Sequence, residues 1–306
     1  MLGADISFLP QLEDRGIKFR EDGKEQDAIQ ILKAHGFNYI RLRIFNDPAC
    51  DSGYAPGKGY CDLQHTLQMA KRIKAAGMKL LLDFHYSDYW ADPAKQYKPA
   101  AWRNVNFSQL TEKVYTYSKS VIQALKDQGT APDMVQVGNE INHGMIWPEG
   151  HIGNLDSLAQ LIYAGINGVR AVAPSTTIML HIALGGQNDE SRFFLDNMIA
   201  RGVPFDVIGL SYYPKWHGTL EDLKDNIADL SRHYRKDVIV VEYSQRKQEV
   251  NDIAFNTSGG KGTCIWEPLN TWESFFDKSG NANEYLKLYD EISRKYLGSK
   301  NVKLKM

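Results

Sequence analysis

Short apolar runs alternate with longer amphipathic stretches along this chain, and the pattern repeats about eight times. The apolar runs are bounded by turn residues, which is typical of strands buried on both faces of a parallel sheet. We predict eight strands: Gly3–Ser7, Tyr39–Ile44, Lys79–Phe84, Met134–Val137, Thr177–His181, Val207–Leu210, Val238–Glu242 and Thr263–Trp266.

The stretches between these runs have the apolar spacing of amphipathic helices. Several end at a glycine or before a proline, as helices commonly do. We predict eight helices: Lys24–His35, Leu63–Ala76, Phe107–Gln128, Asp156–Ala173, Glu190–Arg201, Leu220–Tyr234, Gln245–Asn256 and Ala282–Leu297.

Strands that alternate with helices predict a parallel sheet with right-handed crossovers. Eight such units close into a barrel, so we expect an α/β protein in which residues 1–306 form a single (β/α)8 TIM barrel domain. A doubly wound open sheet is the alternative. Against it, no G-x-G-x-x-G follows the first strand and the chain has no Walker-type G-x-x-x-x-G-K-[ST].

Two glutamates stand at the ends of predicted strands. Asn139-Glu140 follows the fourth strand, and Glu242 closes the seventh after four β-branched residues. Active sites of (β/α)8 barrels lie where the strands end, so the fold would bring the two carboxylates together. A lone glutamate after a strand is often an ion-pair partner or helix cap. Two facing carboxylates, however, are the minimal equipment for cleaving a glycosidic bond.

Composition narrows the class of partner. Lys+Arg 36 against Asp+Glu 37 leaves a net charge of −1 without a basic stripe, which argues against nucleic acid and anionic membrane. No apolar stretch approaches the ~20 residues of a membrane span. The first residues, Met1 to Asp5, lack the features of a signal peptide, so either the protein is cytoplasmic or a signal has been removed.

Other chemistries lack their motifs. The chain has no H-E-x-x-H, no clustered Cys/His spacing and no G-x-S-x-G elbow, so we expect neither a metal nor a cofactor. Cys50 and Cys61 flank a loop and are either a disulfide or two free thiols. Cys264 falls in a predicted strand, where it would act as a small core hydrophobe.

Several segments together resemble glycoside hydrolase family 53, the arabinogalactan endo-β-1,4-galactanases of clan A. The stretch from Asp83-Phe84-His85-Tyr86-Ser87-Asp88 to Trp90-Ala91-Asp92-Pro93 is the most specific part. The other matching segments are Gly3-Ala4-Asp5-Ile6-Ser7, Lys95-Gln96, Ala101-Trp102, Val137-Gly138-Asn139-Glu140 and Trp266-Glu267-Pro268.

The resemblance implies a role for each matching position. Glu140 would be the general acid/base and Glu242 the nucleophile, while Asn139 would bind the sugar 2-hydroxyl. Further substrate-binding roles would fall as follows: Arg43 steadies the charge of the nucleophile, His85 and Asp88 line the cleavage subsite, Tyr212 hydrogen-bonds Glu242, Trp266 floors the reacting sugar and Trp90 offers a ring to a more distant one.

Most of these roles have a structural alternative. His85 can be a hydrogen-bonded histidine behind the site, Arg43 an ordinary ion-pair partner and Trp90 a packing residue of its own loop. Tyr213 competes with Tyr212 for the contact with Glu242. Four other tryptophans can belong to the cleft or the core: Trp102, Trp147, Trp216 and Trp272.

The chain departs from the family pattern in three places. Ile141 stands where many relatives have Thr, and no acidic residue follows His181 directly. Some bacterial relatives hold calcium in a long loop after the seventh strand. Here Tyr243–Lys261 contains two acids, Glu249 and Asp252, and must also supply a helix, so we predict no calcium there.

The resemblance implies a retaining endo-β-1,4-galactanase that acts on galactan or galacto-oligosaccharides as a monomer. Because a polymer does not cross a membrane unaided, it also implies a secreted, cell-surface or periplasmic enzyme. Two alternatives remain open: another clan A specificity (exo-galactanase, mannanase or cellulase), and a non-catalytic barrel that binds polysaccharide.

Overall fold

The computed structural model describes residues 1–298, in which eight parallel strands form a closed barrel. The barrel closes because β1 pairs with both β4 and β10. Its strands are β1 (Leu2–Asp5), β4 (Tyr39–Ile44), β5 (Lys79–Phe84), β6 (Met134–Val137), β7 (Thr177–Ile182), β8 (Val207–Tyr212), β9 (Asp237–Tyr243) and β10 (Gly260–Trp266). The predicted (β/α)8 barrel and all eight strands are confirmed, with shifts at some ends.

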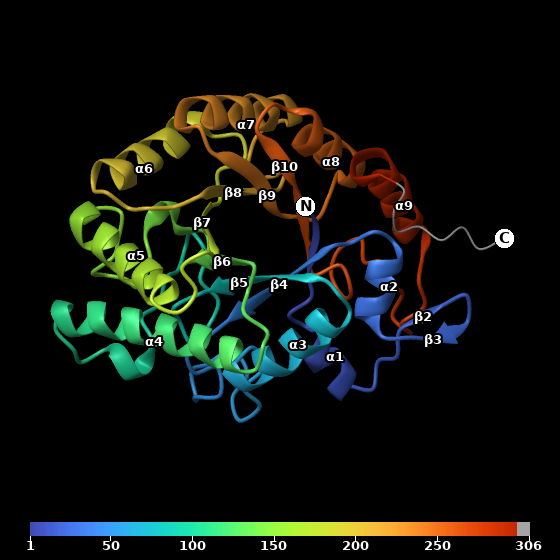
Figure 1. Cartoon of the computed structure of the whole chain (residues 1–306), viewed down its shortest axis with the longest axis horizontal. Helices are drawn as coiled ribbons and strands as arrows, with labels where there is room; N and C mark the ends of the chain where they lie inside the picture. The colour runs from blue at the N-terminus through green and yellow to red at the C-terminus, as the bar shows by residue number, and fades with distance from the viewer. Residues whose placement is uncertain (299–306) are drawn as a thin grey trace.

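Helices ring the barrel on the outside (Figure 1). They are α1 (Leu9–Asp14), α2 (Ala28–Ala34), α3 (Leu63–Ala75), α4 (Phe107–Asp127), α5 (Leu155–Arg170), α6 (Asn188–Ala200), α7 (Leu220–Tyr234), α8 (Lys247–Asn256) and α9 (Glu284–Leu297), with short 3₁₀ turns η1 (Ala100–Trp102) and η2 (Ile141–His143). No helix of the described residues is long and apolar enough to cross a membrane.

The first predicted helix begins too early in the sequence. Asp27 caps α2 by accepting from the backbone of Ile29, so the helix starts at Ala28. The residues before it form a small hairpin, β2 (Arg20–Glu21) paired with β3 (Lys24–Glu25). The short helix α1 was not predicted, because its six residues are too few to show a helical period.

The barrel interior is divided into an apolar floor and a polar mouth. Seven buried residues fill the floor: Leu81, Met134, Met179, Val207, Ile239, Val241 and Cys264. Towards the strand ends the inward side chains become ionisable or polar, including Asp5, Arg41, Asp83, Gln136 and His181, all buried. This polar upper layer positions the site.

The three cysteines are free thiols in this structure. Cys264 is buried in β10, which confirms its prediction as a core residue. Cys61 is buried and its thiol donates to the carbonyl of Ser7 at 3.7 Å. Cys50 lies 3.8 Å from Asp88 Oδ2, so each thiol of the loop has its own partner.

Candidate active site

Glu140 and Glu242 meet at the mouth of the barrel. A carboxylate oxygen from each and a ring nitrogen of His181 all lie within 4.8 Å of one another. Both glutamates line a cleft of about 580 Å³. The two glutamates are distant in sequence, but they lie close together because the ends of their strands meet at the same mouth of the barrel.

A strained turn presents Glu140. Gly138 has φ of 88°, and a Cβ there would lie 2.5 Å from Ile141 Cγ2. Glu140 itself is left-handed, at φ 49° and ψ 53°, a conformation that non-glycine residues rarely adopt. Backbone strain of this kind concentrates at functional sites. The turn places the carboxyl where Ser211, at the end of β8, donates to Oε1 at 2.6 Å.

Two donors hold Glu242. Arg41 Nη1 lies 3.2 Å from Oε2, and the Tyr213 hydroxyl donates to Oε1 at 2.9 Å. The pairing of β8 and β9 shifts between Leu210 and Ser211, so Val241 is an extra residue on β9. A bulge of this type re-aims the side chain that follows it, which here is Glu242.

The surroundings of the two carboxyl groups differ in how strongly they favour the protonated form. Burial raises the pKa of Glu140 to about 8, and the nearby charge of Glu242 adds to this effect. Burial also raises the pKa of Glu242, but the Arg41 cation and the Tyr213 hydroxyl oppose it by stabilising the carboxylate. Glu140 is therefore the carboxyl that keeps its proton, and Glu242 is the one favoured to ionise.

Arg41 ties together the polar layer beneath the cleft. Its guanidinium donates to Asp5 Oδ2 and Asp83 Oδ2, each at 2.9 Å. It also donates to Asn139 Oδ1 at 2.8 Å, while Asn139 Nδ2 donates to the carbonyl of Ala91 at 2.8 Å. The amide of Asn139 is thus fixed in orientation beside Glu140.

The expected contact between Arg43 and the nucleophile is wrong, because Arg41 makes it. Both arginines lie two residues apart on β4 and so face the barrel interior. Arg43 instead pairs with Glu267 Oε1 at 2.5 Å. Its guanidinium is stacked between Phe8 and Trp90, at 4.5 and 4.3 Å from the ring centroids. Sequence spacing could not show which arginine would find Glu242.

The expected contact of Tyr212 with Glu242 is also wrong. Successive strand residues face opposite sides, and the Tyr212 hydroxyl donates to the carbonyl of Gly218 at 3.2 Å. Tyr213, the competing residue, turns towards the cleft and bonds Glu242.

His85 and Asp88 are not among the residues that line the cleft. His85 Nε2 pairs with Asp83 Oδ2 at 3.1 Å, and its Nδ1 accepts from the backbone of Ala91 at 3.1 Å. The carboxylate of Asp88 accepts from the backbone nitrogens of Asp47 and Ala100, at 2.9 and 2.7 Å. Both side chains stabilise the long loops beside the cleft.

Three tryptophans line the cleft. Trp266 ends β10 and lies at the position expected for a sugar platform. Trp216 and Trp272, which the sequence left unassigned, are 56% and 60% exposed. Trp90 packs against Trp266, with ring centroids 6.3 Å apart, and does not itself line the cleft. Whether an aromatic ring is exposed beside the two carboxylates depends on the tertiary structure and cannot be read from the sequence.

Glu140, His181 and Glu242 are near enough to hold a cation. Both ring nitrogens of His181 already have protein partners, Gln136 Nε2 at 2.9 Å and Ser211 Oγ at 2.8 Å. A metal ion would have to displace one of these hydrogen bonds. The cluster is therefore better described as an acid–base group than as a ligand set.

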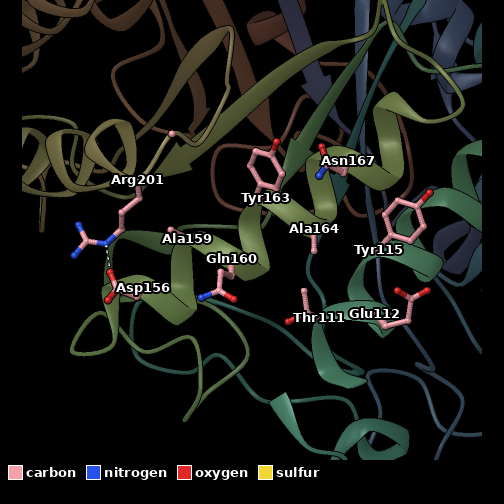
Figure 2. A pocket seen from close by; sticks show the side chains of 11 residues that line it. Thr111, Glu112, Tyr115, Asp156, Ala159, Gln160, Tyr163, Ala164, Asn167 and Arg201 are labelled. Atoms are coloured by element: carbon pink, nitrogen blue, oxygen red, sulfur yellow. Dashed lines mark hydrogen bonds and ion pairs between the residues drawn. The ribbon is translucent and has the colours of Figure 1, made fainter. Parts of the chain in front are cut away.

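A larger hollow, of about 920 Å³, lies on the outer face of the helix layer, where α4 and α5 pack together (Figure 2). Tyr115, Tyr163 and Asn167 stand along it, and Asp156 at one end pairs with Arg201 at 2.7 Å. The hollow lacks the facing carboxylates of the barrel mouth, so its size does not make it the site of chemistry.

A parallel (β/α)8 barrel with two facing carboxyl groups at its mouth is an arrangement typical of glycoside hydrolases. The model of glycosyl hydrolase family 53 matches residues 1–290, and the chain belongs to that family. The solved Ignisphaera aggregans GH53 catalytic domain superimposes with a TM-score of 0.89 at 32% identity, covering 98% of this chain and 95% of that one.

Two curated relatives are longer than this chain. An uncharacterized protein of Niallia circulans, from the bgaB 5′ region, is 46% identical over 251 residues, covering 79% of this chain and 66% of the relative. The endo-beta-1,4-galactanase of Bacillus subtilis is 37% identical over 272 residues, covering 88% of this chain and 62% of the relative. The chain thus spans just under two thirds of their length.

Proposed function

We propose that this protein is a retaining endo-β-1,4-galactanase that hydrolyses internal bonds of galactan or type I arabinogalactan. The observation that carries the proposal is the facing pair Glu140 and Glu242, with carboxylate oxygens within 4.8 Å. Retaining glycosidases separate their carboxyl groups by about 5–5.5 Å, and inverting ones by roughly 6.5–9.5 Å. The name of the Bacillus subtilis relative supports the choice of galactan.

The first step is glycosyl transfer to the enzyme. Glu140, protonated, donates its proton to the departing glycosidic oxygen while the Glu242 carboxylate attacks the anomeric carbon. The C–O bond to the leaving chain breaks as the bond to Glu242 forms. Arg41 and Tyr213 hold the nucleophile ionised and oriented.

The second step releases the sugar. Glu140, now ionised, removes a proton from water as the water attacks the anomeric carbon, and Glu242 leaves as a carboxylate. Two inversions give net retention of configuration. Asn139, fixed by Arg41 and Ala91, is proposed to bond the 2-hydroxyl of the reacting sugar, and Trp266 to support its face.

The remaining proposed substrate contacts follow the structure. Trp216 and Trp272 are offered to sugars beyond the reacting one, because both rings are exposed in the cleft. Trp90, Arg43, His85 and Asp88 are proposed to act behind the cleft, through Trp266 and the loops they hold. Both carboxyl groups come from one chain, so a monomer is sufficient, and a polymeric substrate requires action outside the cell.

The test is product analysis over time on linear β-1,4-galactan, with mannan and cellulose as parallel substrates. Mixed galacto-oligosaccharides appearing early, from galactan alone, are expected of an endo-galactanase. Galactose or one fixed oligomer from the outset would establish exo action. Proton NMR of the first product should show the β-anomer before mutarotation, and an initial α-anomer would exclude retention.

A further inference from the structure

A chain of hydrogen bonds runs through the barrel interior to Glu140. It links Gln136 on β6, His181 on β7 and Ser211 on β8, which are all fully buried. The successive contacts are Gln136 Nε2 to His181 Nδ1 at 2.9 Å, His181 Nε2 to Ser211 Oγ at 2.8 Å and Ser211 Oγ to Glu140 Oε1 at 2.6 Å.

The charged neighbours of Gln136 fix the direction of this chain. Its Nε2 donates to Asp83 Oδ1 at 2.7 Å, and its Oε1 accepts from Arg41 Nε at 3.3 Å. Exchanging the amide atoms would put an oxygen against the Asp83 carboxylate and an NH₂ group against the Arg41 cation. The second N–H of Gln136 faces His181 Nδ1 at 2.9 Å, a shorter contact than those with Asn139 Oδ1 at 3.2 Å and the carbonyl of Gly138 at 3.4 Å.

The tautomer of His181 follows from its donors. Gln136 Nε2 at 2.9 Å and the backbone N–H of Glu140 at 3.4 Å both point at Nδ1, so Nδ1 is the bare, accepting nitrogen. Asn139 Oδ1 lies 3.1 Å from Nδ1, farther than Gln136 Nε2 at 2.9 Å, and already accepts from Arg41 Nη2 at 2.8 Å. Burial lowers the pKa of His181 well below its usual range, so the ring stays neutral with its one proton on Nε2.

Each later atom in the chain is then determined. His181 Nε2–H donates to Ser211 Oγ, so the Ser211 hydroxyl proton is free to point at Glu140 Oε1. Oε1 can only accept. Oε2 has no hydrogen-bond partner among residues 1–298, and Glu140 lines the cleft.

We propose that Gln136, His181 and Ser211 are positioning residues that force the catalytic proton of Glu140 onto Oε2, the oxygen offered to the glycosidic bond. The inference rests on the proposed function and deepens it. The proton leaves Oε2 for the departing oxygen, and the resulting carboxylate keeps the bond from Ser211 at Oε1. After a second proton transfer, from water, Oε2 carries the proton again, so the group is reset without turning.

The same arrangement sets the pH at which Glu140 acts. The hydroxyl of Ser211 stabilises the carboxylate form and opposes the burial that raises the pKa of Glu140. The other charged or titratable groups facing Glu140 are Glu242 on β9, Arg41 on β4, Asp92 in the β5–α4 loop, and His181 and Tyr213.

The test compares two aryl β-1,4-galactobiosides that differ in the acidity of the leaving group. A 2,4-dinitrophenyl group departs without protonation, whereas a 4-methylphenyl group requires the acid. For Ser211→Ala we expect kcat/KM to fall about 10–100-fold on the 4-methylphenyl substrate and less than about 3-fold on the dinitrophenyl substrate. The alkaline limb of the profile should move up by about 0.5–1 pH unit, since one hydrogen bond to the carboxylate is lost.

The controls separate positioning from folding. Ser118→Ala removes an equally buried hydroxyl on α4 that bonds the hydroxyl of Tyr86, and it should leave kcat/KM on both substrates unchanged. Adding His181→Ala to Ser211→Ala should not alter the substrate ratio further, because both act through one hydroxyl proton. Should the histidine variant fail to fold, Ser211→Ala alone decides.

Equal loss on both aryl substrates, or an unchanged ratio with an unmoved alkaline limb, would overturn the inference. Wild-type turnover of linear galactan is measured first. If the wild type does not cleave galactan, the proposed function fails. If the wild type cleaves it and Ser211→Ala keeps the ratio, the positioning role alone fails.

Discussion

Arg41 and Glu242 form an ion pair across the barrel mouth, with Nη1 3.2 Å from Oε2. The same guanidinium pairs with Asp5 and Asp83, so one cation contacts Glu242 and two further buried carboxylates. Burial raises the pKa of Glu242, and the Arg41 cation opposes this rise by stabilising the carboxylate. Arg41 therefore affects both the ionisation and the orientation of Glu242.

Arg41→Lys keeps the charge but removes the planar fork that reaches several acceptors at once. We expect kcat/KM on galactan to fall roughly 10–150-fold, the worth of one hydrogen bond to a charged group. Arg43→Lys breaks the contact with Glu267, so we expect it to lower the thermal midpoint while leaving kcat close to the wild-type value. Kinetics and thermal unfolding of both variants check this. A larger loss of kcat/KM in Arg43→Lys than in Arg41→Lys would show that Arg43 supports Glu242 after all.

Tyr213→Phe removes a hydrogen bond from the Glu242 carboxylate. We expect kcat/KM to fall about 10-fold, and the acidic limb of the pH profile to move to higher pH because the pKa of Glu242 rises further. Tyr212→Phe loses a bond to the carbonyl of Gly218 and should keep the profile of the wild type. A shift in the Tyr212 variant instead would contradict the geometry of the β8 end.

The pH dependence of activity should follow the proton on Glu140. The proposed mechanism requires Glu140 protonated and Glu242 ionised, so kcat/KM is expected to decline as pH rises through about 8. Glu140→Ala should abolish turnover of galactan but keep a slow turnover of the dinitrophenyl substrate with no alkaline limb, and azide should speed that turnover by attacking the glycosyl-enzyme, since an anionic nucleophile needs no general base. Persistence of the limb in that variant would assign it to another group.

The raised pKa of Glu140 also affects stability. Its folded value of about 8 exceeds the ordinary 4.5, so the folded state binds more protons between those values and loses stability as pH rises through that window. Glu140→Gln removes the buried charge. We expect its thermal midpoint to exceed that of the wild type by a few degrees at pH 9 and by less at pH 5. Equal gains at both pH values would show that charge is not the cause.

The exposed cleft tryptophans should govern affinity for long substrates. Trp216→Ala and Trp272→Ala are each expected to raise KM for galactan roughly 3–10-fold, with less change in kcat on an aryl galactobioside. Tyr163→Ala, in the outer hollow of Figure 2, removes an exposed ring away from the cleft and should leave KM unchanged. A rise in KM for that variant would give the hollow a part in substrate binding.

The sequence by itself determined the barrel, its eight strands and the positions of Glu140 and Glu242 at strand ends. These follow from local pattern, because a strand buried on both faces must be apolar and a helix beside it must be amphipathic. The segments shared with family 53 carried the family identity, which the match over residues 1–290 confirms. Neither conclusion required knowledge of any contact.

Only the tertiary structure decided which neighbour serves each glutamate. Arg41 and Arg43 share one face of β4, and the choice between them depends on Glu267, which directly follows β10 and pairs with Arg43. Tyr213 replaces Tyr212 because a bulge and the strand end set the direction of each side chain. The Gln136–His181–Ser211 chain joins three strands. Such contacts depend on register and side-chain direction across the barrel, which local periodicity does not encode.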